Sequence, residues 1–391
     1  MTKMTEEFKF TKVRHTVQVL LPDGRAIEGP RGATIEAFLQ PLAAEGGAET
    51  VGAIINGSLR ELTFCIGIES QVVPVTMHSS DGMRIYRRSL NFLLETAFEE
   101  LFSGGHLIID HSVSFGGYFC RVTGREALTQ ADLDRLAGRM RELVEQDLRI
   151  SRSEVPLADA IEIFRQAGQQ DKVRLLAHRK KDYLILYELN GHRDYHHGYM
   201  VPSSGYLKWF ELTFIEGGFT LRFPRRHNST EIEPLGEYPK LLATFREYGD
   251  WLERLGIESV GALNDAILDG RIRELVLVSE ALHEQRIAEM AGQIAARKDK
   301  VRVVLIAGPS SSGKTTTSKR LSVQLLAHGL HPFPLEMDNF FVSRDMTPKD
   351  EKGEYDFEHL DAIDRPRLNH DVKKLIAGEE VQIPRYDFHT G

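Results

Sequence analysis

The chain has 391 residues, and its 49 lysine and arginine residues against 57 aspartate and glutamate residues give a formal net charge of −8. With 41% hydrophobic and 27% charged residues and no long uncharged run, the composition excludes a disordered protein and a membrane protein. The amino-terminal MTKMTEEFKF lacks the apolar core of a secretory signal, and Cys65 and Cys120 are the only cysteines, so we expect a cytoplasmic protein with reduced thiols.

The first predicted elements form a small β-rich unit. Alternating apolar residues over 17–21 predict a half-buried strand, and Pro22-Asp23-Gly24 predicts a hairpin turn. Thr34 is placed to cap a short helix, and the β-branched run over 51–55 meets Asn56-Gly57, a strong hairpin signal. The unit resembles a TGS domain, the ubiquitin-like module of threonyl-tRNA synthetases and some GTPases, in the strings TVQVLLPDGRAIEGPRGATIEAF and AIINGSLREL. This resemblance implies a β-grasp domain over residues 1–75 that binds a ligand or partner.

The next segment, residues 76–232, mixes helical and strand patterns. Thr129 and Asp132 have the spacing of a capping box, and apolar residues at helical spacing over 133–144 predict a helix that packs on a core. The segment resembles the second additional domain of threonyl-tRNA synthetase, which removes mischarged serine, in the strings IYRRSLNFLLETAFEELF, VSFGGYFCRV and LTQADLDRLAGRMRELV. The resemblance implies an α+β domain.

In that synthetase family the metal-binding and editing residues include a His-x-x-x-His pair and a later Cys-x-x-x-His pair. The first pair falls here on Arg88 and Phe92, and the second on His196 and Met200, so neither pair is kept. A guanidinium and a phenyl ring cannot bind zinc. We therefore predict no catalytic metal in this segment, and a polar groove or hydrogen-bonded buried positions for its clustered histidines, His192, His196 and His197.

Short basic runs in the same segment are a candidate surface for a nucleotide or RNA ligand, because arginine pairs bidentately with phosphate. The alternative is that they are ordinary solvated faces. The runs comprise Arg84, Arg87 and Arg88, then Arg179, Lys180 and Lys181, then Arg225 and Arg226.

Residues 233–300 predict successive amphipathic helices separated at Gly256 and Gly270, which form a helical connector. An α/β domain is then predicted over 301–391. It opens with the apolar run Val301–Ile306, which predicts a buried parallel strand.

A phosphate-binding loop follows that run. The sequence GPSSSGKT fits G-x-x-x-x-G-K-[ST] and precedes a helical run that ends at Gly329. Backbone amides of such a loop bind phosphates at the positive end of a helix dipole, the lysine reaches the β- and γ-phosphates, and the threonine hydroxyl binds Mg²⁺. The predicted ATP-binding residues are Gly308, Pro309, Ser310, Ser311, Ser312, Gly313, Lys314, Thr315 and Thr316.

A second strand is predicted over Phe333–Met337, which would deliver Asp338 at its carboxyl end, where ligands gather in open α/β sheets. The domain resembles the uridine kinase and phosphoribulokinase group of P-loop kinases in the strings GPSSSGKTTTSKRL, MDNFF, YDFEHLDAIDRPRL and VQIPRYDFHTG. A complete domain of this type has about 200 residues, so we expect residues 301–391 to be the first half of one.

The kinase resemblance implies a role for particular side chains. Asp338 would accept the proton of the acceptor 5′-hydroxyl and, with Thr315, hold magnesium, while Lys314 binds phosphate. Glu358 takes the place of an aspartate that binds sugar hydroxyls. The aromatic residues of the nucleoside pocket are Phe341, Tyr386 and Phe388.

Each of these residues also has an ordinary structural explanation: a helix cap or loop carboxylate for Asp338, a solvated face for Glu358, and packing for the aromatic rings. The leading hypothesis is an ATP-dependent nucleoside kinase of the uridine or cytidine type with amino-terminal recognition or regulatory domains. A phosphorylated sugar is another acceptor class. The rivals are a non-catalytic nucleotide- or tRNA-binding regulator and an editing hydrolase of charged tRNA, the last disfavoured by its missing ligands.

Overall fold

The computed structural model describes residues 14–46, 49–113, 116–234, 236, 239–309, 311–349 and 353–391. It is a mixed α/β structure with several sheets, and it divides into two compact units, Met1–Ala266 and Ile267–Gly391. Among the described residues, none of the helices combines the length and apolar character that a bilayer crossing requires. Both cysteines are free thiols, Cys65 exposed and Cys120 buried.

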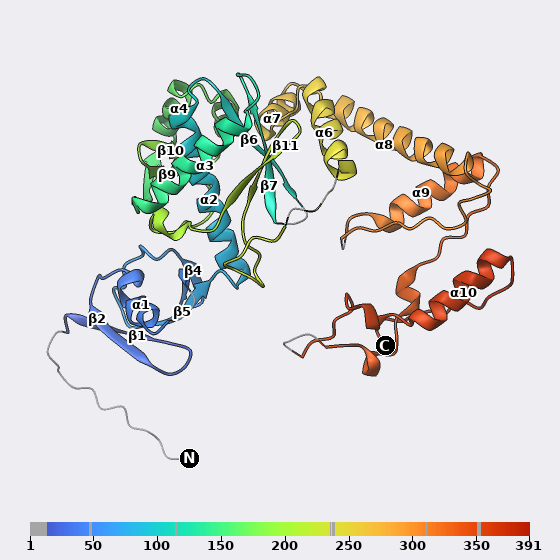
Figure 1. Ribbon diagram of the computed structural model, residues 1–391, viewed down its shortest axis with the longest axis horizontal. Coiled ribbons are helices and arrows are strands. Elements are labelled where there is room, and N and C mark those ends of the chain that lie inside the picture. Colours follow the sequence, from blue (N-terminus) through green and yellow to red (C-terminus); the bar gives the residue numbers. More distant parts are fainter. Residues whose placement is uncertain are drawn as a thin grey trace, which may run out of the picture. The chain divides into compact units, whose positions relative to one another are not determined.

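The first unit begins with a five-stranded sheet in the order β2-β1-β5-β3-β4, in which β1 and β5 are parallel and the other pairs antiparallel (Figure 1). Both predicted hairpins are confirmed, because Gly24 and the Asn56-Gly57 pair adopt the left-handed backbone that their turns need. The Thr34 hydroxyl accepts from the Ala37 amide, so the predicted cap is confirmed too. The elements are β1 (Thr16–Leu20), β2 (Ala26–Pro30), α1 (Ile35–Ala44), β3 (Thr50–Ile55), β4 (Ser58–Arg60) and β5 (Ser70–Thr76).

The larger part of the first unit is built around the long helix α2 (Ser80–Leu101), whose apolar face lies in the main core. Strands β6 (His106–Val113), β7 (Gly117–Thr123), β11 (Glu211–Ile215) and β12 (Gly218–Arg222) form a sheet in the order β11-β12-β7-β6. A second sheet, β10-β9-β8, consists of β8 (Ser151–Pro156), β9 (Tyr183–Leu189) and β10 (His192–Asp194).

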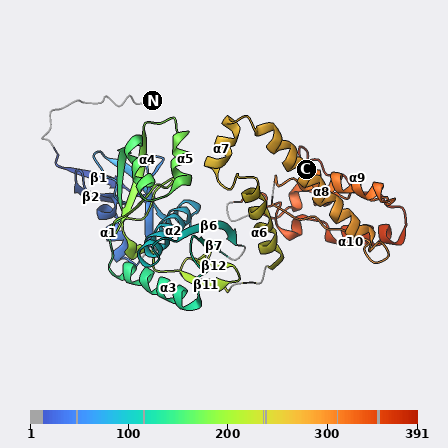
Figure 2. The same cartoon turned by 90° about the horizontal axis from the view of Figure 1, so that it is seen from above.

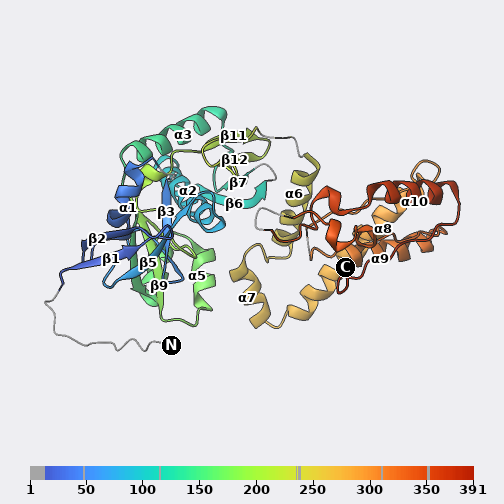
Figure 3. The same ribbon diagram turned by 90° about the horizontal axis from the view of Figure 1, so that it is seen from below.

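Three helices flank these sheets. Helix α3 (Gln130–Glu145) contacts α2 and β11 (Figure 3), and its predicted capping box between Thr129 and Asp132 is confirmed. The predicted stripe on α3 is buried except for Val144, which is partly buried, so the pattern identified the helix and its core face together. Helices α4 (Leu157–Gln166) and α5 (Gln170–Ala177) pack on each other, and α4 also covers β9 (Figure 2).

The predicted succession of helices after residue 233 is present in the described residues. Helices α6 (Pro239–Arg254) and α7 (Val260–Leu268) are followed by α8 (Ile272–Ala295). Gly256 and Gly270 follow α6 and α7 with positive φ angles of 67° and 77°, so both helices end where glycine permits a left-handed residue.

In the second unit, α8 packs along α9 (Lys314–Ala327) through a small apolar cluster (Figure 1). The rest of this unit comprises three short 3₁₀ turns, η2 (Met337–Phe340), η3 (Arg344–Met346) and η4 (Leu360–Ala362), and helix α10 (Arg365–Ala377). Asp364 caps α10 by accepting from the Arg367 amide at 3.0 Å.

The two strands predicted for the kinase half are wrong. The described part of residues 267–391 contains no β-strand, so the Val301–Ile306 run is unpaired there, and Leu305 is 84% exposed. Phe333 is 62% exposed, and Met337 begins a 3₁₀ turn rather than ending a strand. A parallel strand needs neighbouring strands and a covering helix layer, and these two apolar runs do not pair with each other.

Candidate functional site

The predicted phosphate-binding loop has backbone features suited to an anion. Ser311 and Gly313 have positive φ angles of 59° and 85°, so the chain turns sharply just before α9 begins. A Cβ atom at Gly308 would come within 2.7 Å of the Ser312 Oγ, so the loop closes tightly on itself there. Alternating left-handed residues before a helix amino terminus form a concave set of N–H groups that binds anions.

Lys314 is the first residue of α9, and its Nζ donates to the carbonyl oxygens of Gly308 and Pro309, both at 2.9 Å. The ammonium therefore folds back over the loop that it would share with a phosphate. Thr315 and Thr316 are exposed in the first helical turn. Ser310, one of the predicted loop residues, lies outside the described residues. The other predicted loop residues are all in this loop and helix start.

The predicted aromatic residues of the substrate pocket lie together. The Phe341 ring centroid is 5.5 Å from that of Tyr386 and 5.8 Å from that of Phe388, and the last two are 5.0 Å apart. Phe357, which the sequence did not single out, joins them at 5.3 Å from Phe341. The Tyr386 hydroxyl is buried without a hydrogen-bond partner among the residues that the structure describes, whereas Glu358, next to Phe357, is exposed. We call these four rings the aromatic cluster.

Backbone pairing between distant segments builds the aromatic cluster. Phe341 forms an isolated β-bridge with Ile363, and the Val342 amide donates to the Ala362 carbonyl at 2.9 Å. The Arg344 guanidinium donates to the Phe388 carbonyl and so links the segment that carries Tyr386 and Phe388 to the segment that carries Phe341. The four kinase-like strings therefore contribute to two local sites, the loop and the aromatic cluster.

Asp338, the predicted proton acceptor, is exposed in η2, close in sequence to Phe341. Within the described residues, no hydrogen bond or ion pair links its carboxylate to Lys314 or Thr315. We expected Asp338 to lie beside the phosphate-binding loop at the carboxyl edge of a sheet. The strands that would bring them together are not formed in the described residues. The structure therefore brings predicted residues together in the loop and in the aromatic cluster, and in the described residues no hydrogen bond or ion pair joins Asp338 to the loop.

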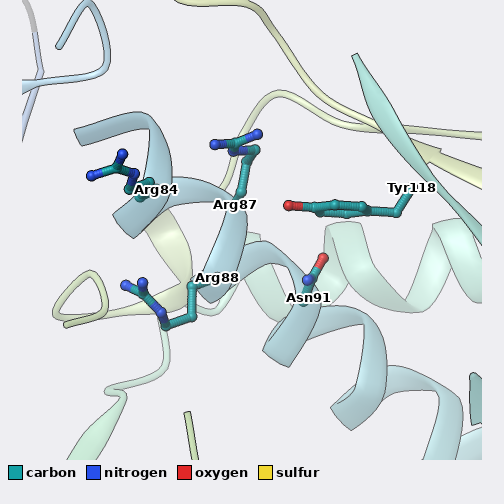
Figure 4. A pocket seen from close by; sticks show the side chains of 5 residues that line it. All are labelled: Arg84, Arg87, Arg88, Asn91 and Tyr118. Atoms are coloured by element: carbon teal, nitrogen blue, oxygen red, sulfur yellow. The ribbon is translucent and has the colours of Figure 1, made fainter. Parts of the chain in front are cut away.

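A basic pocket lies in the first unit. Its volume is about 230 Å³, and four of its five lining residues come from one face of α2: Arg84, Arg87, Arg88 and Asn91, with Tyr118 of β7 opposite. Figure 4 shows the Tyr118 ring pointing its hydroxyl toward that helix. The Asn91 Oδ1 is buried without a hydrogen-bond partner.

The electrostatics of the basic pocket favour an anion. Burial, reinforced by the neighbouring Arg84 and Arg87, holds the pKa of Arg88 below its usual range. Arg88 donates to the Tyr199 carbonyl at 2.6 Å, and neither Arg87 nor Arg88 pairs with a carboxylate in the described part of the chain. Three guanidiniums spaced i, i+3 and i+4 repel one another, and a bound anion would relieve that repulsion.

An adjoining cavity of about 510 Å³ extends the basic pocket and adds Arg225 and Arg226 to its lining. The second predicted basic run, residues 179–181, does not line either cavity, and there the Arg179 Nε donates to the Tyr183 carbonyl. The sequence therefore named five of the cationic residues correctly as neighbours but missed Asn91 and Tyr118, which carry no motif.

A buried cluster of acidic and histidine side chains lies between α2 and β10. The Phe92 ring, at a position where the resemblance expects histidine, packs 5.2 Å from the His192 ring and 5.3 Å from the His196 ring. His192 Nδ1 is 2.7 Å from a Glu99 oxygen, and His196 Nε2 is 3.5 Å from a Glu95 oxygen. The predicted partner is therefore present for His192 at Nδ1, whereas the Nε2 atoms of both histidines are buried without a hydrogen-bond partner among the described residues.

Lys172 and the two histidines oppose the effect of burial on the carboxylates of this cluster. Burial raises the pKa of Asp194, against the opposing effect of Lys172, which donates to it. Burial also works to raise the pKa of Glu95, but His196, Lys172 and His192 together outweigh it and hold the pKa below its usual range. The hydrogen bond from His192 likewise lowers the pKa of Glu99. The Glu95 and Glu99 carboxylates are therefore favoured as anions, whereas burial works against the charged form of Asp194.

Comparison with known proteins identifies two regions. Residues 303–391 match the model of the Phosphoribulokinase / Uridine kinase family. The amino-terminal half is similar to threonine–tRNA ligases: 30% identity over 203 residues to that of Geobacter sp. (strain M21), and 27% over 205 residues to threonine–tRNA ligase 2 of Bacillus subtilis (strain 168). Each match covers 52% of this chain and 32% of the relative.

The chain thus spans about a third of the length of these curated relatives. It joins a region similar to threonine–tRNA ligases to a stretch that matches the model of the Phosphoribulokinase / Uridine kinase family.

Proposed function

We propose that this protein is an ATP-dependent kinase that transfers the γ-phosphoryl group to the 5′-hydroxyl of a pyrimidine nucleoside. The observation that carries the proposal is the loop before α9, where two left-handed residues and a lysine folded over the loop carbonyls precede a helix amino terminus. This arrangement supports binding of a phosphate chain. The family match of residues 303–391 supports the reaction class.

In this proposal the loop amides donate to the phosphates, and Lys314 leaves the Gly308 and Pro309 carbonyls to reach the transferred group. Bound ATP supplies that group, and magnesium held by Thr315 and Asp338 would offset its negative charge. Asp338 accepts the proton of the acceptor hydroxyl. The proposal requires the segment around Asp338 to approach the loop, since positioning supplies most of the catalysis in phosphoryl transfer.

The aromatic cluster is the proposed nucleoside site. Its rings offer apolar faces for a base, and Phe388 is 52% exposed, so a ligand can reach them. The buried Tyr386 hydroxyl without a partner favours a ligand with a polar group, because an unpaired buried hydroxyl is costly. Glu358 is exposed next to Phe357 in sequence, where it can bind a sugar hydroxyl.

The test is ATP turnover by the full-length protein with a panel of uridine, cytidine, adenosine, guanosine and a phosphorylated pentose. We expect ADP release with a pyrimidine nucleoside, and a loss of about 10²-fold or more in Asp338→Asn because the proton acceptor is gone. The matched control is Asp345→Asn, an exposed carboxylate in η3. Absence of acceptor-dependent ADP release across the panel contradicts the proposal.

For the amino-terminal region we infer a regulatory or recognition role in which the basic pocket binds the phosphate of a nucleotide or RNA. Arg87 and Arg88 line the pocket and form no ion pair with a carboxylate in the described residues, which supports this role, as does the similarity to threonine–tRNA ligases. The β2-β1-β5-β3-β4 sheet with helix α1 supports a β-grasp TGS domain over residues 1–75. The proposed domains that follow are 76–232, the connector 233–300 and the kinase half 301–391.

Filter binding of labelled tRNA and of free nucleotides distinguishes the ligands of the basic pocket. Arg87→Ala should weaken phosphate-dependent binding by about tenfold or more, because a charge-assisted hydrogen bond is lost. Arg193→Ala, an exposed arginine paired with Glu188, should have no effect. Equal binding by wild type and Arg87→Ala would exclude the basic pocket as the phosphate-binding site.

A further inference from the structure

Three side chains between α2 and β10 bring their ligand atoms together in the main core. Atoms of Glu95, His192 and Asp194 all lie within 4.8 Å of one another. His192 and Asp194 are two residues apart on one strand and so share a face, and Glu95 comes from the helix beside that strand. The sequence gives no sign of this arrangement, since Glu95 and His192 are about a hundred residues apart.

The protonation of His192 is fixed by its neighbour. Its Nδ1 lies 2.7 Å from Glu99, and a carboxylate accepts, so Nδ1 carries the proton. The lone pair is then on Nε2. The His192 side chain is only 6% exposed, and its Nε2 is buried with no hydrogen-bond partner in the described structure. A carboxylate that orients a histidine in this way, with the other nitrogen left free, is the usual outer partner of a metal ligand.

We propose that Glu95, His192 and Asp194 bind a divalent transition-metal ion of the zinc class, with Glu99 orienting His192. One imidazole and two carboxylates are ligands that zinc accepts, and three protein ligands leave a fourth position for water or another ligand. The positions differ from the histidine and cysteine pairs implied by the synthetase resemblance. The site is independent of the proposed kinase reaction.

Both the ligand spacing and the neighbouring side chains affect how this site would bind a metal ion. Tetrahedral zinc with bonds of about 2.0–2.1 Å places its ligand atoms about 3.3 Å apart, so the three side chains must close in slightly. Lys172 donates to Asp194 and competes for it, while the Glu95 Oε2 accepts no hydrogen bond in the described structure. His196 lies 3.5 Å from that oxygen, at the edge of the set. Burying a carboxylate oxygen such as the Glu95 Oε2 without a hydrogen bond is costly, and a cation would offset the cost.

The experiment is a zinc titration of the metal-stripped full-length protein by calorimetry, without nucleotide or magnesium. We expect one equivalent of zinc bound and a rise in the melting temperature, because a ligand that binds only the folded state stabilises it. Cobalt is a second probe, since its visible absorption reports tetrahedral coordination.

The variants make the result specific. Glu95→Gln and His192→Gln should each abolish stoichiometric binding, and Glu99→Gln should weaken it by about 10- to 100-fold, because it removes only the orienting partner. His197→Gln, an exposed histidine near the same strand, should bind like wild type. Circular dichroism checks that each variant folds. No stoichiometric uptake, or uptake unchanged in both Glu95→Gln and His192→Gln, overturns the proposal.

Discussion

The two compact units of this chain differ in how their strands obtain partners. In the first unit, β1–β2 and β3–β4 are hairpins closed by short turns, and β6 and β7 are joined by a short connection. In the second unit, the apolar runs over 301–306 and 333–337 are separated by a helix and stay unpaired. Antiparallel pairing follows from local turn chemistry, whereas parallel pairing depends on strands supplied from elsewhere.

The functional sites show the same contrast. The phosphate-binding loop is contiguous, so its motif could be recognised without knowledge of any other segment. The basic pocket instead combines one face of α2 with Tyr118 of β7. The buried cluster of acidic and histidine side chains combines α2 with β10. A site made by packing has no contiguous motif.

The largest expected effect comes from comparing the core of the first unit with the exposed run of the second. Leu90 is fully buried, so Leu90→Ala should cost about 3 kcal/mol through lost burial and a cavity. In the 391-residue chain Leu305→Ala should change stability by less than about 0.5 kcal/mol, because the side chain is largely exposed.

Urea unfolding measures both. Both tryptophans, Trp209 and Trp251, lie in the first unit, so their fluorescence follows that unit alone, and circular dichroism follows both units. If Leu305→Ala proves as costly as Leu90→Ala, the run is buried in a sheet and the contrast between the units fails.

A second prediction tests the loop as a local site. Lys314→Ala should weaken ATP binding by about a hundredfold, corresponding to about 2–3 kcal/mol, since a charge-assisted contact with phosphate is removed. Lys319→Ala, an exposed lysine of the same helix, serves as the control in equilibrium binding of a fluorescent ATP analogue. Equal affinities of the Lys314 variant and wild type would remove the basis of the proposed kinase.

The smallest expected effect concerns a buried histidine of the first unit. His111 stacks on Phe245 with ring centroids 4.0 Å apart, and burial lowers its pKa despite the opposing influence of Asp110. The unfolded chain then holds the proton more tightly. The contribution of neutral, buried His111 to the free energy of unfolding is therefore complete above about pH 6.5, the usual pKa of histidine, and is lost as the pH falls below that value.

Melting temperatures measured from about pH 5 to pH 7.5 check this sign. His111→Phe keeps the stack on Phe245 and should flatten the pH dependence in that window. All other titrating groups are the same in both proteins and provide a common background. An unchanged slope in the variant would mean that another group causes the dependence.

Most residues that sequence reasoning placed correctly interact with residues close to them in the chain, and the aromatic cluster is the exception. Thr34 and Thr129 cap the helices that follow them, and the glycines at 256 and 270 end the helices before them. Phe341, Tyr386 and Phe388 were grouped through motif order, and Phe357 was missed because it has no motif role of its own.

By itself, the sequence determined the caps, turns, hairpins and the phosphate-binding loop, because each depends on residues within a few positions of one another. Only the tertiary structure decided which apolar runs pair into sheets and which charged side chains meet. Glu95 and His192 are neighbours because α2 packs beside β10, and Leu305 is exposed because its run has no partner strand. Burial and pairing between distant segments depend on the whole packed chain, which no local pattern records.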